Sequence, residues 1–150
     1  MSDRRYSFDT NILFYSVDHN DAARQKRAAS LLARAARELD CVIPLQAFCE
    51  FYHAATRKGH LKHEIASSLV ETWQDLYPTA YPSAKTFRNA TAAVRDHNLS
   101  FWDAMLWAVV NEAGVNVLFS EDLQHGHQLG TVRFWNPFLD EDPFLASRST

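Results

Sequence analysis

The sequence predicts an α/β fold in three layers, with a central parallel sheet of about five strands flanked by helices. Short apolar segments typical of strands alternate along the chain with longer segments that have helical periodicity. This alternation is the pattern of βαβ units, which place their strands side by side in a parallel sheet. Segment 115–119 is almost continuously apolar, as expected of a parallel strand that is buried on both faces.

The first half of the chain is predicted to alternate strands and helices. The apolar residues of segment 22–39 recur at helical spacing and form one stripe. Pro44 follows a short apolar strand and opens a helix, a position that favours proline, and Gly59 ends that helix. The elements predicted in this half are strands at 6–8 and 41–43 and helices at 11–16, 22–39, 44–57 and 61–76.

Serine residues mark the starts of two helices in the second half. Ser83 is predicted to cap a helix that continues to about His97, and Ser100 caps a strongly apolar helix that Gly114 ends. Pro78 places its segment at a sheet edge, because proline cannot donate a ladder hydrogen bond. The elements predicted in this half are an edge strand at 77–81, helices at 83–97 and 101–113, and strands at 115–119 and 132–135, followed by an irregular tail.

Length and composition indicate one globular domain over residues 1–150, with a flexible tail at 146–150. A chain of 150 residues is long enough to bury roughly 68–70% of its unfolded surface. The 47% apolar and 22% charged content is ordinary for a globular protein. The net charge of −3 does not indicate a nucleic-acid partner, so any phosphate-binding surface must be local or assisted by a metal.

The two cysteines, Cys41 and Cys49, lie in segments that are expected to be buried. Thiols are common core residues, and two of them do not indicate a disulfide framework. The N-terminus leads directly into a strand, and no long apolar segment follows it. We therefore expect a cytoplasmic protein with no membrane segment.

Four acidic residues stand where a carboxylate contributes little to packing. Asp9 ends the first strand, and ligands of open α/β sheets bind just beyond the carboxyl ends of the strands. Asp122 likewise follows the apolar strand at 115–119. Glu50 lies inside an apolar helix, and Asp103 lies in the first turn of another. We expect these four residues to converge and to hold a divalent metal ion.

Each acid also has a purely structural interpretation. Asp9 is a favoured helix N-cap, and Asp103, three residues after a serine, approximates a capping box. Asp122 could simply be solvated. Glu50 could point outward or pair with a basic residue near the end of its helix, but apolar neighbours on several sides predict limited exposure, which favours a functional carboxylate.

Several carboxylates in one place require a cation. Two like charges about 4 Å apart repel by roughly 4 kcal/mol at an effective dielectric constant near 20. Oxygen ligands without a nearby set of histidines and cysteines select Mg²⁺ or Mn²⁺. Such an ion binds phosphate oxygens and lowers the pKa of a bound water. The reaction class that follows is metal-assisted hydrolysis of a phosphodiester.

Four short motifs surround the acids. They are Phe8-Asp9-Thr10-Asn11, Glu50 in a helix opened by proline, Ser100-Phe101-Trp102-Asp103-Ala104, and Phe119-Ser120-Glu121-Asp122-Leu123-Gln124-His125-Gly126. Together they resemble the PIN-domain nucleases, and most of all the VapC-type ribonuclease toxins of bacterial type II toxin–antitoxin modules. The resemblance extends over residues 6–138 and preserves the order and approximate spacing of all four acids.

The resemblance implies a PIN-like domain that acts as an Mg²⁺-dependent endonuclease on RNA, with Mn²⁺ as a substitute ion. Asp9, Asp103 and Asp122 would bind the metal. Glu50 would orient or deprotonate the attacking water, directly or through a second ion. The resemblance also implies a homodimer that is inhibited by a cognate antitoxin.

Further residues are candidates for supporting roles. Asn11 and Ser120 match supporting polar positions of the family beside the first and last acids. Glu121 is less regular and is a candidate for a second ion or for a supporting contact. Basic residues could steer the RNA backbone, although a solvated helix face is the commoner role of each one. These residues are Arg24, Arg27, Arg57 and Lys58.

Three alternatives stay open at this point. The first is a PIN-domain nuclease that processes RNA without an antitoxin, and the second is a binding module that has the fold without the chemistry. The third is an aspartyl-phosphate phosphatase of the haloacid-dehalogenase type. Such enzymes need a second aspartate two residues after the first, and this chain has Asn11 there.

Overall fold

A five-stranded sheet forms the centre of the molecule in the computed structural model, which describes residues 4–139. Its strands are β1 (Arg5–Phe8), β2 (Asp40–Cys41), β5 (Val117–Phe119), β6 (Gln128–Leu129) and β7 (Val132–Trp135). They lie in the order β2-β1-β5-β7-β6. All neighbours are parallel except β6, which pairs antiparallel with β7. The predicted tail at 146–150 lies outside the described residues.

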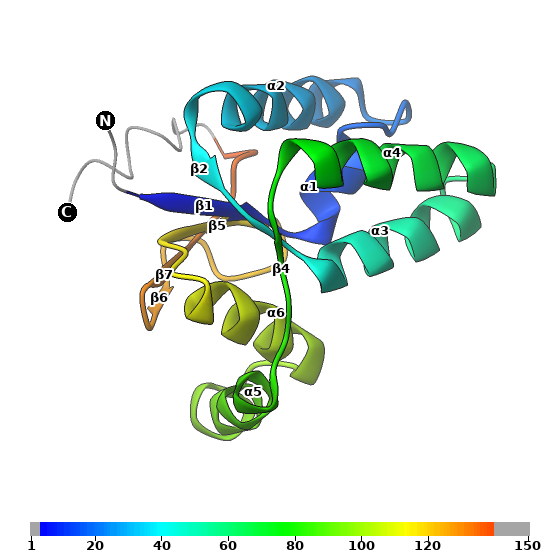
Figure 1. Cartoon of the computed structure of the whole chain (residues 1–150). Coiled ribbons are helices and arrows are strands. Elements are labelled where there is room, and N and C mark those ends of the chain that lie inside the picture. Colours follow the sequence, from blue (N-terminus) through cyan, green and yellow to red (C-terminus); the bar gives the residue numbers. More distant parts are fainter. Residues whose placement is uncertain (1–3, 140–150) are drawn as a thin grey trace.

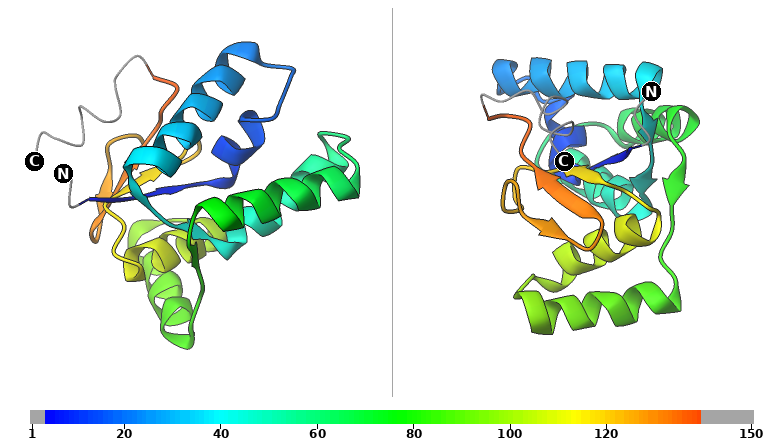
Figure 2. Two further views of the ribbon diagram at one scale, coloured as in Figure 1. Left: turned by 45° about the horizontal axis from the view of Figure 1, so that its top comes forward. Right: turned by 90° about the vertical axis from the view of Figure 1, so that its left-hand side faces the viewer.

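Helices cover both faces of this sheet. Within residues 4–139 they are α1 (Thr10–Tyr15), α2 (Ala22–Glu38), α3 (Leu45–Arg57), α4 (His63–Leu76), α5 (Ala84–His97) and α6 (Phe101–Glu112). The sheet lies between α2 on one side and α6 with α5 on the other (Figures 1 and 2). The predicted three-layer α/β architecture is therefore confirmed. No helix in the described part of the chain has the length and apolar character needed to span a membrane.

The structure corrects the predicted strand at 41–43 and the predicted edge strand at 77–81. The first is divided, because Cys41 ends β2 while Ile43 begins β3 (Ile43–Pro44). The second contains only β4 (Thr79–Ala80), which pairs with β3 in a separate two-stranded ladder and not with the central sheet. Pro78 contributes its carbonyl, which accepts a hydrogen bond of 2.9 Å from the Ile43 amide.

The strand β6 was not predicted. It is two residues long and has no alternating apolar pattern that would indicate a strand. A turn at Gly130, with φ of +59°, reverses the chain between β6 and β7. This φ lies in the left-handed region that favours glycine. In this hairpin β6 pairs with β7, which would be the edge strand of a purely parallel sheet.

Both predicted serine caps are present. The Ser83 hydroxyl accepts from the Thr86 amide in a capping box that starts α5, and the Ser100 hydroxyl accepts from the Asp103 amide at the start of α6. The cysteines differ from each other. Cys41 is buried as expected, and burial raises the pKa of its thiol. Cys49 is exposed, so its predicted burial is wrong.

Aromatic packing aligns the ends of the two central strands. Phe8 lies opposite Phe119 in the parallel register, and their ring centroids are 5.3 Å apart. The ring of Tyr6 also stacks on Phe119 at 5.9 Å. Both phenylalanines are fully buried. The residues that follow them, Asp9 and Ser120, consequently leave the sheet side by side.

We expect Phe119→Ala to lower the free energy of unfolding by about 3–5 kcal/mol, because it removes a fully buried ring and leaves a cavity. Urea denaturation would measure the change. Phe87→Ala is the matched control, since the Phe87 ring is 53% exposed and its removal should cost less than about 1 kcal/mol. Equal losses in the two variants would contradict this account of the core.

Candidate active site

Asp9 is a buried carboxylate at the junction of β1 and α1. It is only 6% exposed. Its Oδ1 accepts from the Thr10 amide at 2.7 Å, and its Oδ2 accepts from the Ser120 hydroxyl at 2.7 Å. Asp9 is the N-cap of α1, so the structural interpretation is correct, but capping occupies only one of its two oxygens.

Burial raises the pKa of Asp9 from 3.8 to about 6. The hydrogen bonds from Ser120 and Thr10 lower this pKa, while the negative charges of Glu50 and Asp122 raise it further. None of the described ion pairs includes Asp9. The site therefore holds a carboxylate that is desolvated and surrounded by like charge, which is the electrostatic setting of a cation site.

Ser120 and Asn11 connect the loop after β5 to this carboxylate. Ser120 is fully buried, and its hydroxyl donates to Asp9 and accepts from the Asp122 amide at 3.2 Å. The Asn11 Nδ2 donates to Asp122 Oδ2 at 3.1 Å, and its Oδ1 accepts from the Glu121 amide at 3.3 Å. An aspartate at position 11 could not donate to Asp122 and would repel it.

Glu50 is exposed, which corrects the prediction of limited exposure. The buried residues of α3 lie on one face of the helix, and Glu50 stands at the edge of that face. Its Oε2 accepts from the Thr10 hydroxyl at 2.9 Å, and its Oε1 accepts from Gln46 Nε2 at 2.8 Å. Glu50 therefore faces solvent while α1 and its own helix hold both oxygens.

Gln46 also connects α3 to the first turn of α6. The same amide nitrogen that binds Glu50 donates to the carbonyl of Trp102 at 3.0 Å. Asp103 is the next residue and is partly buried, and its amide donates to the Ser100 hydroxyl. The structure thus brings the turn that contains Asp103 to the helix that contains Glu50. The Trp102 side chain at this junction is 63% exposed.

The chemistry of these donors fits a hard divalent cation, since carboxylates, hydroxyls and amides are oxygen ligands. Their present orientations do not form a compact ligand set: no group of three or more His, Cys, Asp or Glu side chains within residues 4–139 has the spacing to hold a metal ion. Each oxygen of Asp9 and Glu50, and one of Asp122, instead accepts from a neighbouring residue. Ser120 links Asp9 to the Asp122 amide, Asn11 binds the Asp122 carboxylate, and Thr10 links Asp9 to Glu50.

Glu121 points to a different set of partners. Its carboxylate pairs with Arg24 at 2.9 Å. It also forms a hydrogen bond with Tyr15, and this bond, together with burial, raises the pKa of the Tyr15 hydroxyl to about 12. Arg24 pairs with Asp21 as well, at 3.1 Å. The charge of Arg24 is thus compensated by two carboxylates of the fold, and its RNA-steering role stays a prediction.

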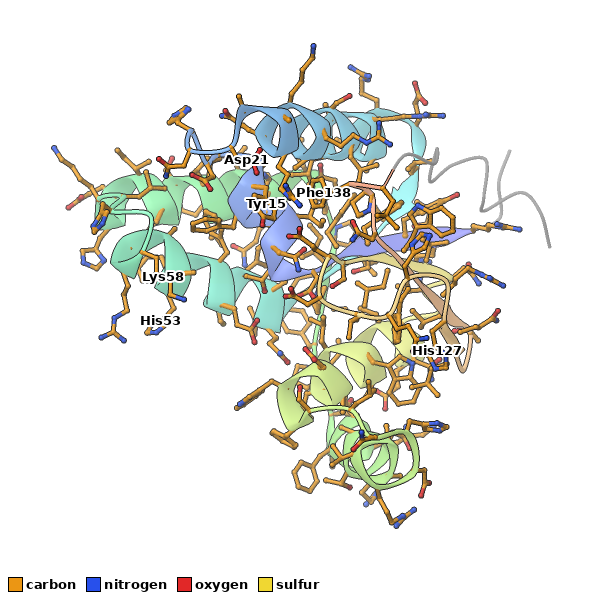
Figure 3. The ribbon with its side chains drawn as sticks, turned by 180° about the vertical axis from the view of Figure 1, so that it is seen from behind. Tyr15, Asp21, His53, Lys58, His127 and Phe138 are labelled. Atoms are coloured by element: carbon orange, nitrogen blue, oxygen red, sulfur yellow. The ribbon has the colours of Figure 1, made fainter. Side chains whose placement is uncertain are left out.

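The other basic candidates lie outside the acidic network. Arg27 donates to the Pro137 carbonyl at 2.9 Å. Arg57 follows Glu50 by two turns of α3, and its Nη1 lies 3.3 Å from His53 Nε2. His53 on α3 and Lys58 directly after it are exposed, and both are labelled in Figure 3. Steering by Arg27, Arg57 and Lys58 stays a prediction.

Comparison with known families decides the assignment. The sequence model of the PIN-domain family matches residues 6–127 of this chain. The chain belongs to the PIN-domain family. Nucleases of this family generally use divalent metal ions, in agreement with the oxygen donors described above. Membership also argues against the phosphatase alternative.

Solved PIN structures share the fold at low sequence identity. VapC20 of Mycobacterium tuberculosis, a Sarcin-Ricin loop cleaving toxin, is 19% identical over 78% of this chain and 89% of its own, with a TM-score of 0.63. VapBC2 of Rickettsia felis, bound to a DNA fragment from its promoter, is 14% identical over 88% and 99%, with a TM-score of 0.64. DNA-bound VapBC of Salmonella typhimurium is 13% identical over 87% and 96%, with a TM-score of 0.61. No curated protein sequence matches the chain significantly.

The raised pKa of Asp9 predicts how stability depends on pH. Between about pH 4 and pH 6 the folded protein binds a proton at Asp9 that the unfolded chain has released. The free energy of unfolding should therefore decrease across this window as pH rises, by up to about 3 kcal/mol from this group, and level off above it. Asp9→Asn should lose this part of the slope and should be more stable than the wild type at neutral pH.

Urea denaturation in EDTA, at several pH values across this window, would test the prediction. Asp75→Asn is the control, because Asp75 is an exposed residue of α4. It should keep the wild-type slope. An Asp9→Asn curve parallel to the wild-type curve at every pH would show that Asp9 is not the group responsible.

Proposed function

We propose that this chain is a metal-dependent endoribonuclease that hydrolyses RNA phosphodiester bonds with Mg²⁺ or Mn²⁺. One observation supports the proposal above all: Asp9, in a PIN fold, is a buried carboxylate beside the charges of Glu50 and Asp122 at the carboxyl ends of β1 and β5. Burying a carboxylate beside other carboxylates costs free energy, and a bound cation would offset this cost.

We assign the residues of the site to distinct tasks. Asp9, Asp103 and Asp122 would hold the ion, which supplies positive charge for the phosphate oxygens and lowers the pKa of a bound water. Ser120 holds Asp9 by donating to its Oδ2. Asn11 holds Asp122 in the same way.

Glu50 is suited to accept the proton of the attacking water. Its oxygens are fixed by Thr10 and Gln46, and its side chain is open to solvent and substrate. In the proposed reaction, water attacks phosphorus in line and gives up a proton towards Glu50. The bond between phosphorus and the 3′ oxygen breaks, and that oxygen takes up a proton. The products are a 3′-hydroxyl and a 5′-phosphate.

The biological role we propose is that of a toxin in a type II toxin–antitoxin pair. VapC20 is a cleaving toxin, and the two VapBC structures are bound to DNA. By analogy this chain would act in the cytoplasm as a homodimer and would be inhibited by a cognate antitoxin. Its substrate would be single-stranded or looped RNA, since an open site with an exposed Glu50 suits an unpaired strand better than a duplex.

The purified protein should cleave RNA in Mg²⁺ or Mn²⁺ and stop when EDTA is added. Asp9→Asn should abolish cleavage while the protein stays folded, because the substitution removes charge without changing volume. Gel analysis of a mixed RNA panel would measure cleavage, and circular dichroism would check the fold. The exposed Asp75→Asn variant should cleave at the wild-type rate.

Two outcomes would refute parts of the proposal. Full activity of Asp9→Asn would refute the role of Asp9. Absence of both cleavage and Mn²⁺ binding in the wild type would favour a non-catalytic binding module. Co-expression with the product of the neighbouring reading frame would test the toxin role: an antitoxin should co-purify with the chain and suppress cleavage, whereas an RNA-processing nuclease would have no such partner.

A further inference from the structure

A second polar cluster lies beside the acidic site, at the junction of α1, α2 and the segment after β7. Its centre is Arg24, whose Nη1 donates to Asp21 at 3.1 Å and whose Nε and Nη2 lie 3.0 and 2.9 Å from Glu121 Oε1. Figure 3 shows Tyr15, Asp21 and Phe138 gathered at this junction. The cluster therefore joins α1 and α2, near the start of the chain, to the loop after β5 and to the segment after β7.

Two aromatic rings enclose the guanidinium group of Arg24. Its Cζ lies 5.5 Å from the centre of the Tyr15 ring and 5.4 Å from the centre of the Phe138 ring. The two rings contact each other edge to face at 5.2 Å. The two distances from Cζ to the ring centres are within the range of a cation–π interaction, which is about 6 Å. The planar guanidinium group lies between two rings and pairs with carboxylates at its edge, and these contacts restrict its orientation. Lysine has no planar, forked group that could make the same contacts.

The segment that carries Phe138 is itself fixed. The amide of Phe138 donates to Asn136 Oδ1 at 3.0 Å, and the amide of Asn136 donates to His125 Nδ1 at 3.0 Å. Arg27, one turn after Arg24 on α2, donates to the Pro137 carbonyl at 2.9 Å. These hydrogen bonds fix the backbone that carries the Phe138 ring.

The loop that this cluster holds contains a proposed metal ligand. Residues 120–122 follow β5 and belong to no helix or strand. The Ser120 amide donates to the Trp135 carbonyl at 2.9 Å, and side chains hold the next two residues. On one side Glu121 is bound by Arg24 and Tyr15. On the other side Asp122 is bound by Asn11. Release of the first contact would leave Asp122 held only by its hydrogen bonds with Asn11 and Ser120.

We propose that Arg24 is a positioning residue for the acidic site. Held between Tyr15 and Phe138, it fixes Glu121 and thereby keeps Asp122 facing Asn11 and Asp9. The inference rests on the proposed function, because Asp122 matters here as a metal ligand. It assigns to Arg24 an action through the protein and not a contact with RNA.

The test compares Arg24→Gln with Arg34→Gln. Both residues are on α2, and Arg34 forms an exposed i,i+4 pair with Glu38 at 3.2 Å. The first readout is the affinity for Mn²⁺ alone, by titration calorimetry. Arg24→Gln should weaken Mn²⁺ binding about 10- to 100-fold, the usual loss when a residue that supports a metal ligand is removed. Arg34→Gln should bind Mn²⁺ as the wild type does.

RNA cleavage gives the second readout. Arg24→Gln should lower kcat at a fixed subsaturating Mn²⁺ concentration and leave the KM for RNA and its salt dependence near the wild-type values. Excess Mn²⁺ should restore much of the loss. Arg24→Lys should be intermediate, because lysine keeps the charge but not the forked pairing. Phe138→Leu should weaken Mn²⁺ binding by a smaller factor. This variant replaces Arg24→Gln in the test if Arg24→Gln fails to fold.

Other results would overturn the inference. A raised KM for RNA with a weaker salt dependence, at unchanged Mn²⁺ affinity, would assign Arg24 to RNA binding instead. Recovery of wild-type Mn²⁺ affinity in Arg24→Gln/Glu121→Gln would mean that Arg24 only neutralises Glu121. Unchanged Mn²⁺ affinity in both Arg24→Gln and Phe138→Leu would refute the inference alone. Failure of the wild type to bind Mn²⁺ or cleave RNA would refute the proposed function, and this inference with it.

Discussion

The hydrogen bond from Ser120 to Asp9 joins the two central strands at the point where both end. It depends on the parallel register in which Phe8 lies opposite Phe119, because only that register brings the next residues together. A slip of one residue would turn these side chains to the opposite face of the sheet. The aromatic core therefore determines the position of the acids, although it contributes no group to the chemistry.

Burial of Asp9 has an electrostatic cost that the local hydrogen bonds offset only in part. Ser120 and Thr10 stabilise the charged form, while desolvation and the charges of Glu50 and Asp122 oppose it, with the net result that the pKa of Asp9 rises. A divalent cation would reverse this balance. The same imbalance that lowers the stability of the folded protein would then provide affinity for the ion.

Charge on this molecule cannot be interpreted from residue type alone. Arg24 has the sequence context of a solvated helix residue, yet it is paired with Asp21 and with Glu121, which is 97 positions later in the chain. Glu50 has the context of a buried residue, yet it is exposed at the edge of the apolar face of α3. Arg24 pairs with Glu121 of a distant loop, while Glu50 accepts from Thr10 of α1 and from Gln46 of its own helix.

The sequence by itself determined what depends on neighbours along the chain. Helical periodicity, the serine caps at Ser83 and Ser100 and the apolar strand before Ser120 are local patterns, and they predicted the order of the elements and the three layers. The four motifs around Asp9, Glu50, Asp103 and Asp122 together predicted the family. The tertiary structure decided what depends on distant segments: the division of the strand at 41–43, the antiparallel pairing of β6 and the partners of Arg24 and Glu121. Strand pairing and ion pairing join residues across long stretches of chain, so no local pattern specifies them.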